Sequence, residues 1–187
     1  RVTTMSSMFA DTISFNGDLS KWDVSRVIDM SAVFRHAVAF NGDISEWVVS
    51  SATTMSYVFA GAASFKCDIL KWDVSSANTM TSMFNSAKSF NGDVSKWDVS
   101  KVTNMVTMFW EATSFKHQLC QSPWLHSKAT KTSMFKGSGG SILSKHCTII
   151  SRVSLKRAVF AYLKLSSKGD RLKISQVPIG KWDVSRI

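Results

Sequence analysis

Polar side chains that can contact a ligand recur every 25 residues along the first part of the chain. They lie in or shortly after Phe-Asn-Gly-Asp segments and the equivalent Phe-Lys-Cys-Asp segment. The columns consist of Asn16, Asp18, Ser20, Asn41, Asp43, Ser45, Asp68, Asn91, Asp93 and Ser95. If equivalent segments lie side by side, these groups form a stripe that faces a ligand or a cation. One Asp per unit provides fewer oxygens than the six or more that calcium takes, and Asn and Asp also satisfy backbone groups in turns. We therefore expect neither a metal nor a cofactor, and the stripe is a candidate ligand-facing surface.

Tryptophan and methionine recur in the same register. The tryptophans are Trp22, Trp47, Trp72 and Trp97, and the methionines are Met5, Met30, Met55, Met80 and Met105. Tryptophan can stack on sugars or bases, and methionine can ligate soft metals. Both residue types more often pack inside a protein, because tryptophan offers a large apolar area and methionine fills irregular gaps. We expect both columns to pack between repeats.

Residues that could support catalysis are scattered. His36, His117, His126 and His146 occupy unrelated positions of the repeat. The chain contains no phosphate loop, no Gly-x-Ser-x-Gly motif and no His-Glu-x-x-His motif. Cys67, Cys120 and Cys147 follow no metal-binding spacing, so we expect isolated buried thiols. The sequence predicts a protein that is not an enzyme.

Each 25-residue unit predicts a short helix followed by a short strand. A residue that caps helices precedes each repeated methionine, and these residues are Thr4, Asp29, Thr54, Thr79 and Asn104. After the first cap, Met5, Met8 and Phe9 form a stripe with helical spacing. Residues 15–22 then alternate between apolar or small side chains and polar ones, as in a strand.

A helix of two turns and one strand cannot enclose a core alone. Stacked units can, because equivalent apolar side chains then form continuous ladders. We predict an α/β, leucine-rich-repeat-like solenoid with one short strand and one short helix per repeat. The regular array covers residues 1–115, with repeats that start at residues 2, 27, 52, 77 and 102.

The pattern Phe-Asn-Gly-Asp-Ile/Val-Ser-x-Trp-Asp-Val-Ser-x-Val-Thr-x-Met-x-x-Met-Phe resembles the BspA-type surface-protein repeat, a relative of leucine-rich repeats. Residues 91–115 come nearest to the pattern. The chain departs from it at Val48, which replaces an Asp, and at Lys66 and Cys67, which replace Asn-Gly. The resemblance implies a curved solenoid, exposure at the cell surface or outside the cell, and binding of host or matrix proteins. It implies no catalytic residues.

Residues 116–187 lose the regular spacing and carry the positive charge. Residues 1–115 contain nine Lys/Arg and eleven Asp/Glu, a net charge of −2, whereas residues 116–187 contain fourteen and two, a net charge of +12. We expect diverged or interrupted repeats of the same solenoid here, ending in a repeat fragment. An unrelated insertion and a gene-model artefact are the alternatives. Because both ends are in phase with the repeat, we expect the chain to be a slice of a longer array.

The predicted function is protein–protein contact or cell adhesion by a non-enzymatic, surface-exposed repeat protein. One alternative is binding of nucleic acid or an anionic membrane through the basic residues 116–187. Nucleic acid is not favoured, because no recognition motif accompanies the basic residues. The other alternative is a structural spacer. No segment has the length and apolar character of a transmembrane helix, and the ligand and the oligomeric state stay open.

Overall fold

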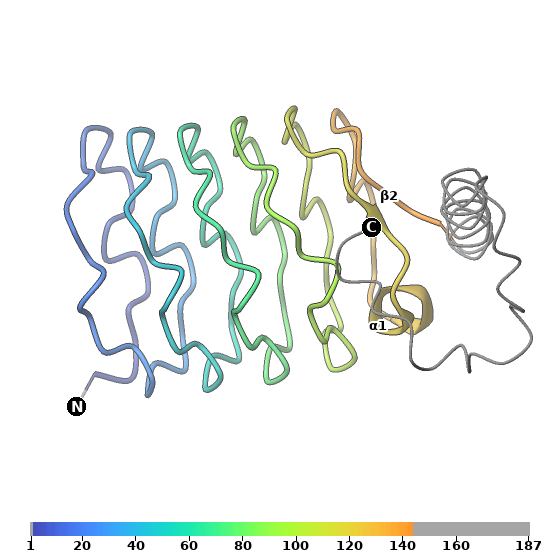
Figure 1. Ribbon diagram of the computed structural model, residues 1–187, viewed down its shortest axis with the longest axis horizontal. Coiled ribbons are helices and arrows are strands. Elements are labelled where there is room, and N and C mark those ends of the chain that lie inside the picture. Colours follow the sequence, from blue (N-terminus) through green and yellow to red (C-terminus); the bar gives the residue numbers. More distant parts are fainter. Residues whose placement is uncertain (1, 144–187) are drawn as a thin grey trace, which may run out of the picture. The chain divides into compact units, whose positions relative to one another are not determined.

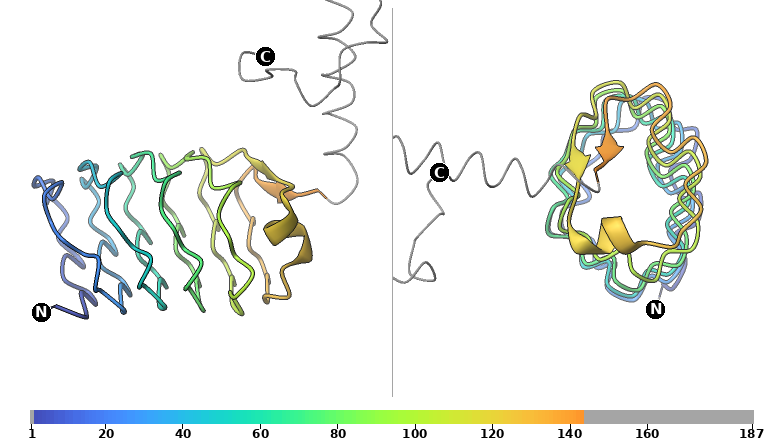
Figure 2. Two further views of the ribbon diagram at one scale, coloured as in Figure 1. Left: turned by 60° about the horizontal axis from the view of Figure 1, so that its bottom comes forward. Right: turned by 90° about the vertical axis from the view of Figure 1, so that its right-hand side faces the viewer.

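The computed structural model describes residues 2–143, and this part of the chain winds in successive circuits that stack along one axis (Figure 1). Viewed along that axis, the circuits superimpose (Figure 2). Repeats 1–5 start at residues 2, 27, 52, 77 and 102, and repeat 6 starts at residue 128. Parallel backbone bridges join neighbouring repeats one after another through Thr4, Asp29, Thr54, Thr79, Asn104 and Thr130. The diverged repeats expected beyond residue 143 lie outside the described residues.

Regular secondary structure within residues 2–143 is confined to repeats 5 and 6. Strand β1 (Gln118–Leu119) pairs in parallel with β2 (Ser141–Ile142). Helix α1 (Ser122–His126) lies between them in the sequence, has a proline in its first turn and buries Trp124. The other described residues form turns and extended connections.

The short helices predicted after the capping residues do not form in repeats 1–5. In repeat 1, the segment folds into consecutive turns, and the amide of Met8 donates to the carbonyl of Met5. Alternate amides donate to the next repeat instead, for example Ser7 N to Ser31 O at 2.8 Å. Ser7 accordingly adopts a left-handed backbone with φ of 57°. A conformation of this kind costs roughly 1–2 kcal/mol per residue, and the hydrogen bonds and ring contacts between repeats offset that cost.

The strand predicted for residues 15–22 does not form either. The carboxylate of Asp18 accepts the amide of Ser20 at 2.9 Å, and the amide of Trp22 donates to the carbonyl of Leu19 at 3.0 Å. These local bonds turn the chain within the segment. Within residues 2–143, strands at the equivalent place occur only in repeats 5 and 6, as β1 and β2.

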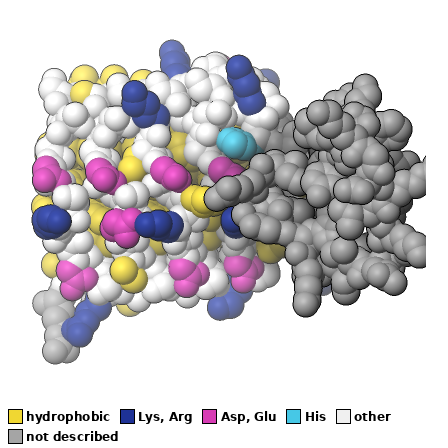
Figure 3. Space-filling view, viewed as in Figure 1, with side chains coloured by type: hydrophobic (Ala, Val, Ile, Leu, Met, Phe, Trp, Pro, Cys, Tyr) yellow, Lys and Arg dark blue, Asp and Glu magenta, His cyan; other side chains and the backbone are white. Residues whose placement is uncertain are grey.

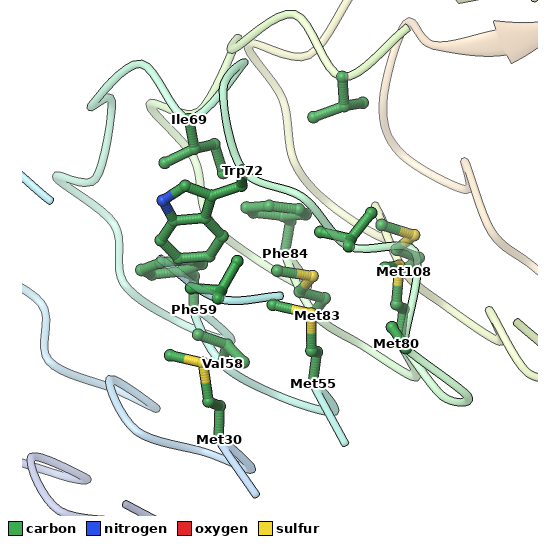
Figure 4. Close-up of a cluster of buried hydrophobic side chains, with 14 of the residues drawn as sticks. Met30, Met55, Val58, Phe59, Ile69, Trp72, Met80, Met83, Phe84 and Met108 are labelled. Carbon is green, nitrogen blue, oxygen red and sulfur yellow. The ribbon is translucent and has the colours of Figure 1, made fainter. Parts of the chain in front are cut away.

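Two columns of phenylalanine stack through the core. Ring centroids lie 5.4–5.6 Å apart along the first column, which consists of Phe9, Phe34, Phe59, Phe84, Phe109 and Phe135. They lie 5.9–6.1 Å apart along the second column, which consists of Phe15, Phe40, Phe65, Phe90 and Phe115. Methionines of successive repeats line up beside these rings (Figure 4). Each buried side chain of this size contributes roughly 1.5–3 kcal/mol, so the interior depends on contacts between repeats.

Tryptophan contributes to the same interior. Trp47, Trp72 and Trp97 are at most 4% exposed, and each donates its Nε1–H to a carbonyl of the preceding repeat, as in Trp72 to Ile44 O at 3.0 Å. The packing interpretation is confirmed for these three residues. Trp22, in repeat 1, is 43% exposed.

Repeat 6 places a lysine in the methionine column. Thr130 bridges to Asn104, so Lys131 takes the position that Met105 has in repeat 5. Its Nζ donates to Ser127 O at 2.7 Å and to Ala129 O at 3.0 Å. A charged side chain therefore stands where every earlier repeat buries a thioether.

Lys131→Met is expected to raise the free energy of unfolding by about 1 kcal/mol at pH 7, because a methionine continues the apolar column. Burial lowers the pKa of the Lys131 ammonium group from its ordinary value of 10.5. The pKa of Lys131 is lower in the folded protein than in the unfolded one. The full free-energy cost of burying its charged ammonium group therefore applies at neutral pH. This cost disappears as the pH rises from the lowered pKa through the ordinary value of 10.5. The wild type should therefore gain stability over this alkaline range, and the variant should lack that gain.

Urea unfolding at pH 7 and at pH 10 measures both effects. Lys128→Met removes the same charge from an exposed position and should leave stability unchanged. If the Lys131 variant is the less stable protein at pH 7, the two hydrogen bonds of the ammonium group outweigh its burial.

Candidate binding face

Asparagine side chains of the predicted stripe connect neighbouring repeats. The amide of Asn41 donates to Asn16 Oδ1 at 2.8 Å, that of Lys66 to Asn41 Oδ1 at 2.9 Å, and that of Lys116 to Asn91 Oδ1 at 3.0 Å. The side-chain oxygen thus takes the place that a backbone carbonyl has in a strand ladder. This column has a structural role, and its oxygens are already engaged.

The carboxylates of the stripe close local turns. Oδ1 of each aspartate accepts the amide two residues later at 2.8–3.0 Å, in the pairs Asp18–Ser20, Asp43–Ser45, Asp68–Leu70 and Asp93–Ser95. The hydrogen bonds from the serines lower the pKa of Asp18 and Asp43, so both are charged at neutral pH. Turn chemistry therefore engages Oδ1 of each of these four carboxylates.

Two further columns share this face and are absent from the predicted stripe. The first is Asp23, Asp73 and Asp98, each of which accepts an amide two residues later at 3.0 Å. The second is Lys21, Lys71 and Lys96, which are all exposed. Rows of acidic side chains flank a row that is mainly basic (Figure 3). The recurring Lys-Trp-Asp-Val-Ser pattern of the sequence could have predicted these two columns. We call residues 16–25 and their equivalents in repeats 2–4 the charged face.

Repeat 2 departs from the pattern of the charged face. Glu46 stands in the lysine column, and its Oε1 lies 2.6 Å from Lys71 Nζ. Val48 stands in the second aspartate column and is 56% exposed. A hollow of about 280 Å³ opens here, and its lining includes Ser45, Glu46, Val48, Lys71 and Asp73.

The histidines in the described part of the chain have separate local partners. His36 Nδ1 lies 2.9 Å from Asp11 Oδ1, His117 Nε2 lies 3.0 Å from Asn91 O, and His126 Nδ1 lies 2.9 Å from Ser122 O. The hydrogen bond from His36, followed by one from Arg35, lowers the pKa of Asp11. The three histidines occupy different positions of the repeat, and His146 lies outside the described residues.

The cysteines differ from one another. Cys67 has a free thiol, and partial burial raises the pKa of that thiol. Cys120 is disulfide-bonded, so the expectation of isolated thiols is wrong for this residue. A rule based on sequence spacing considers only positions along the chain, and it does not identify a cysteine that forms a disulfide bond. Cys147 lies outside the described residues.

Two kinds of site are absent from residues 2–143. This part of the chain has no group of three or more His, Cys, Asp or Glu side chains arranged to hold a metal ion. It also has no helix with the length and apolar character needed to cross a membrane.

Comparison with known families identifies the repeat. A family model described as "Mycoplasma protein of unknown function, DUF285" matches residues 1–70 and again residues 43–142. The chain belongs to the DUF285 family. Together the two overlapping matches cover residues 1–142 of the stack of DUF285 repeats and end with β2. Neither the curated proteins nor the solved structures gave a match.

Proposed function

We propose that this DUF285 protein is a non-enzymatic binding array whose charged face contacts a protein on a cell or in a matrix. The fixed spacing of the carboxylates on that face carries the proposal. Local turns hold Asp18, Asp43, Asp68 and Asp93 in the same conformation, one repeat apart. A partner can therefore make several equivalent weak contacts at once, and its affinity grows with their number.

The proposal includes a closer relationship to BspA-type surface repeats and a location at the cell surface or outside the cell. Its support is the repeated Phe-Asn-Gly-Asp and Trp-Asp-Val-Ser pattern of the sequence. The complete array would be a solenoid that resembles leucine-rich repeats in its winding. Consecutive turns would replace the helix of each repeat.

Replacing Asp18, Asp43, Asp68 and Asp93 together by asparagine is expected to weaken binding to matrix proteins about tenfold or more, which is about 1.4 kcal/mol. Asparagine keeps the Oδ1 acceptor that closes each turn but removes the charge. The fold should therefore persist, and thermal unfolding monitored by circular dichroism checks this. Surface plasmon resonance on immobilised fibronectin, laminin and collagen measures the binding.

A matched variant neutralises carboxylates outside the charged face. Asp29→Asn keeps the turn to Ser31, and Glu111→Gln removes an exposed charge. This double variant should bind like the wild type. Equal binding by the wild type and the four-aspartate variant would reject the charged face as the binding surface.

The two alternatives give different results. A nucleic-acid or membrane protein would bind duplex DNA or phosphatidylserine vesicles, would keep that binding in the four-aspartate variant, and would lose it between low and moderate salt. A structural spacer would show no saturable binding to any of these probes. Either result would replace the present proposal.

A further inference from the structure

The charged face is regular except in repeat 2, where two neighbouring positions change together. Glu46 replaces a lysine that recurs as Lys21, Lys71 and Lys96, and Val48 replaces an aspartate. In Figure 3 a hydrophobic side chain interrupts the lower row of acidic ones. Because these positions point outward in every repeat, packing of the core does not require the changes. The two changes therefore alter the surface of the protein.

The two changes combine an apolar floor with a negative rim. Val48 is 56% exposed and lines the hollow together with Glu46, Lys71 and Asp73. Glu46 and Lys71 neutralise each other at 2.6 Å, so the lining keeps the negative charge of Asp73. Ser75 N engages Asp73 Oδ1 at 3.0 Å, and hydrogen bonds from Ser75 lower the pKa of this carboxyl. Asp73 is therefore charged at neutral pH.

The register places a second carboxylate on the other side of the floor. Val48 lies one repeat after Asp23 and one repeat before Asp73. Neighbouring parallel chains are about 4.8 Å apart, so carboxylates flank the exposed valine on both sides. A ligand group in the hollow meets the apolar surface of Val48 and the negative charge of Asp73, and Asp23 lies beyond Val48 in the preceding repeat.

We propose that this hollow receives a lysine or arginine side chain of the protein partner, an inference that rests on the proposed function. Both side chains have an apolar stem, which can cover Val48, and a cationic head, which can reach the flanking carboxylates. An arginine head can also form two parallel hydrogen bonds with one carboxylate. Acidic side chains are repelled, and a purely apolar one leaves the rim unused.

The test uses the full chain with ¹³C-labelled valine methyl groups. N-acetyl-arginine amide and N-acetyl-lysine amide are titrated separately, and the methyl shifts of Val48 and of Val49, which also lines the hollow, are followed. Saturation is expected at roughly 1–10 mM, the range for a ligand of this size with one good contact. N-acetyl-norleucine amide and N-acetyl-glutamate amide should produce no saturable shift.

Two variants locate the site. E46K/V48D gives repeat 2 the residues of its neighbours and should weaken binding, read at Val49, about tenfold or more. E46K/V48D/K71E/D73V keeps the net charge of the chain but moves the Glu and Val of repeat 2 to the equivalent positions of repeat 3. It should bind like the wild type, with the shift now at Val74.

Three results would overturn the inference: no saturable shift in the wild type, equal binding by wild type and E46K/V48D, or equal binding of the norleucine amide. These experiments leave Asp18, Asp43, Asp68 and Asp93 unchanged. Failure here together with loss of matrix binding in the four-aspartate variant would reject the hollow but retain the binding array. Saturable binding at the hollow together with unchanged matrix binding in the four-aspartate variant would reject the binding array as proposed.

Discussion

Phe84→Ala is expected to lower the free energy of unfolding by about 3–5 kcal/mol. Phe84 is fully buried, and its ring lies 4.0 Å from that of Phe90 within the repeat. It also stacks on Phe59 at 5.6 Å and on Phe109 at 5.4 Å in the two neighbouring repeats. Removing the ring therefore opens a cavity and breaks contacts in three repeats at once. Equilibrium unfolding in urea measures the loss.

Two comparisons make this result specific. Lys88→Ala changes an exposed side chain of the same repeat and should alter stability by less than about 0.5 kcal/mol. Phe9→Ala, at the half-buried end of the same column, should cost less than Phe84→Ala because Phe9 has one neighbouring repeat. Equal effects of all three substitutions would show that the phenylalanine column does not carry the stability of the stack.

Inserting a second copy of residues 77–101 after Lys101 is expected to give a longer and more stable protein. The copy meets repeat 5 through the same residues as in the wild type, and it meets repeat 4 through a new contact in which each residue packs on its own equivalent. In a stack of repeats, stability is approximately a sum of repeat and neighbour terms. The surface exposed on unfolding should also grow by roughly a sixth, and the urea m value should grow with it.

The matched control inserts 25 residues of alternating glycine and serine at the same point. It should lower the melting temperature, because it separates Phe84 from Phe109 without supplying a ring between them. Urea titration and thermal unfolding compare the two insertions. If the repeat insertion also destabilises the protein, the junctions between repeats are not interchangeable and the stack is not additive.

Several features were readable from the sequence because identical residues recur in one register. A residue that meets its own equivalent in the next repeat is buried or exposed together with its column. The buried phenylalanine, methionine and inner tryptophan residues follow this rule. The turns at Asp18 and Asp43 were also within reach, since they use only residues two positions apart.

Local conformation was not readable in the same way. Met5, Met8 and Phe9 have the spacing of a helix, but the hydrogen bonds between repeats select turns with left-handed residues. In the sequence, Gly61 could have indicated these left-handed turns. It shares a column with Asp11, and all members of that column have positive φ. A spacing rule considers one segment, whereas the amides of Met5 and Phe9 donate to carbonyls 24 positions away.

The repeat register, the buried columns and the short turns thus came from the sequence by itself, since each depends on residue type and a fixed interval. The tertiary structure decided the asparagine bridges, the breadth of the charged face and the hollow at Val48. Glu46, Val48, Lys71 and Asp73 belong to two different repeats and line one hollow only because the circuits stack. The physical reason is that a stack assigns the hydrogen bonds and neighbours of each segment to the adjacent circuits, and no single segment specifies them.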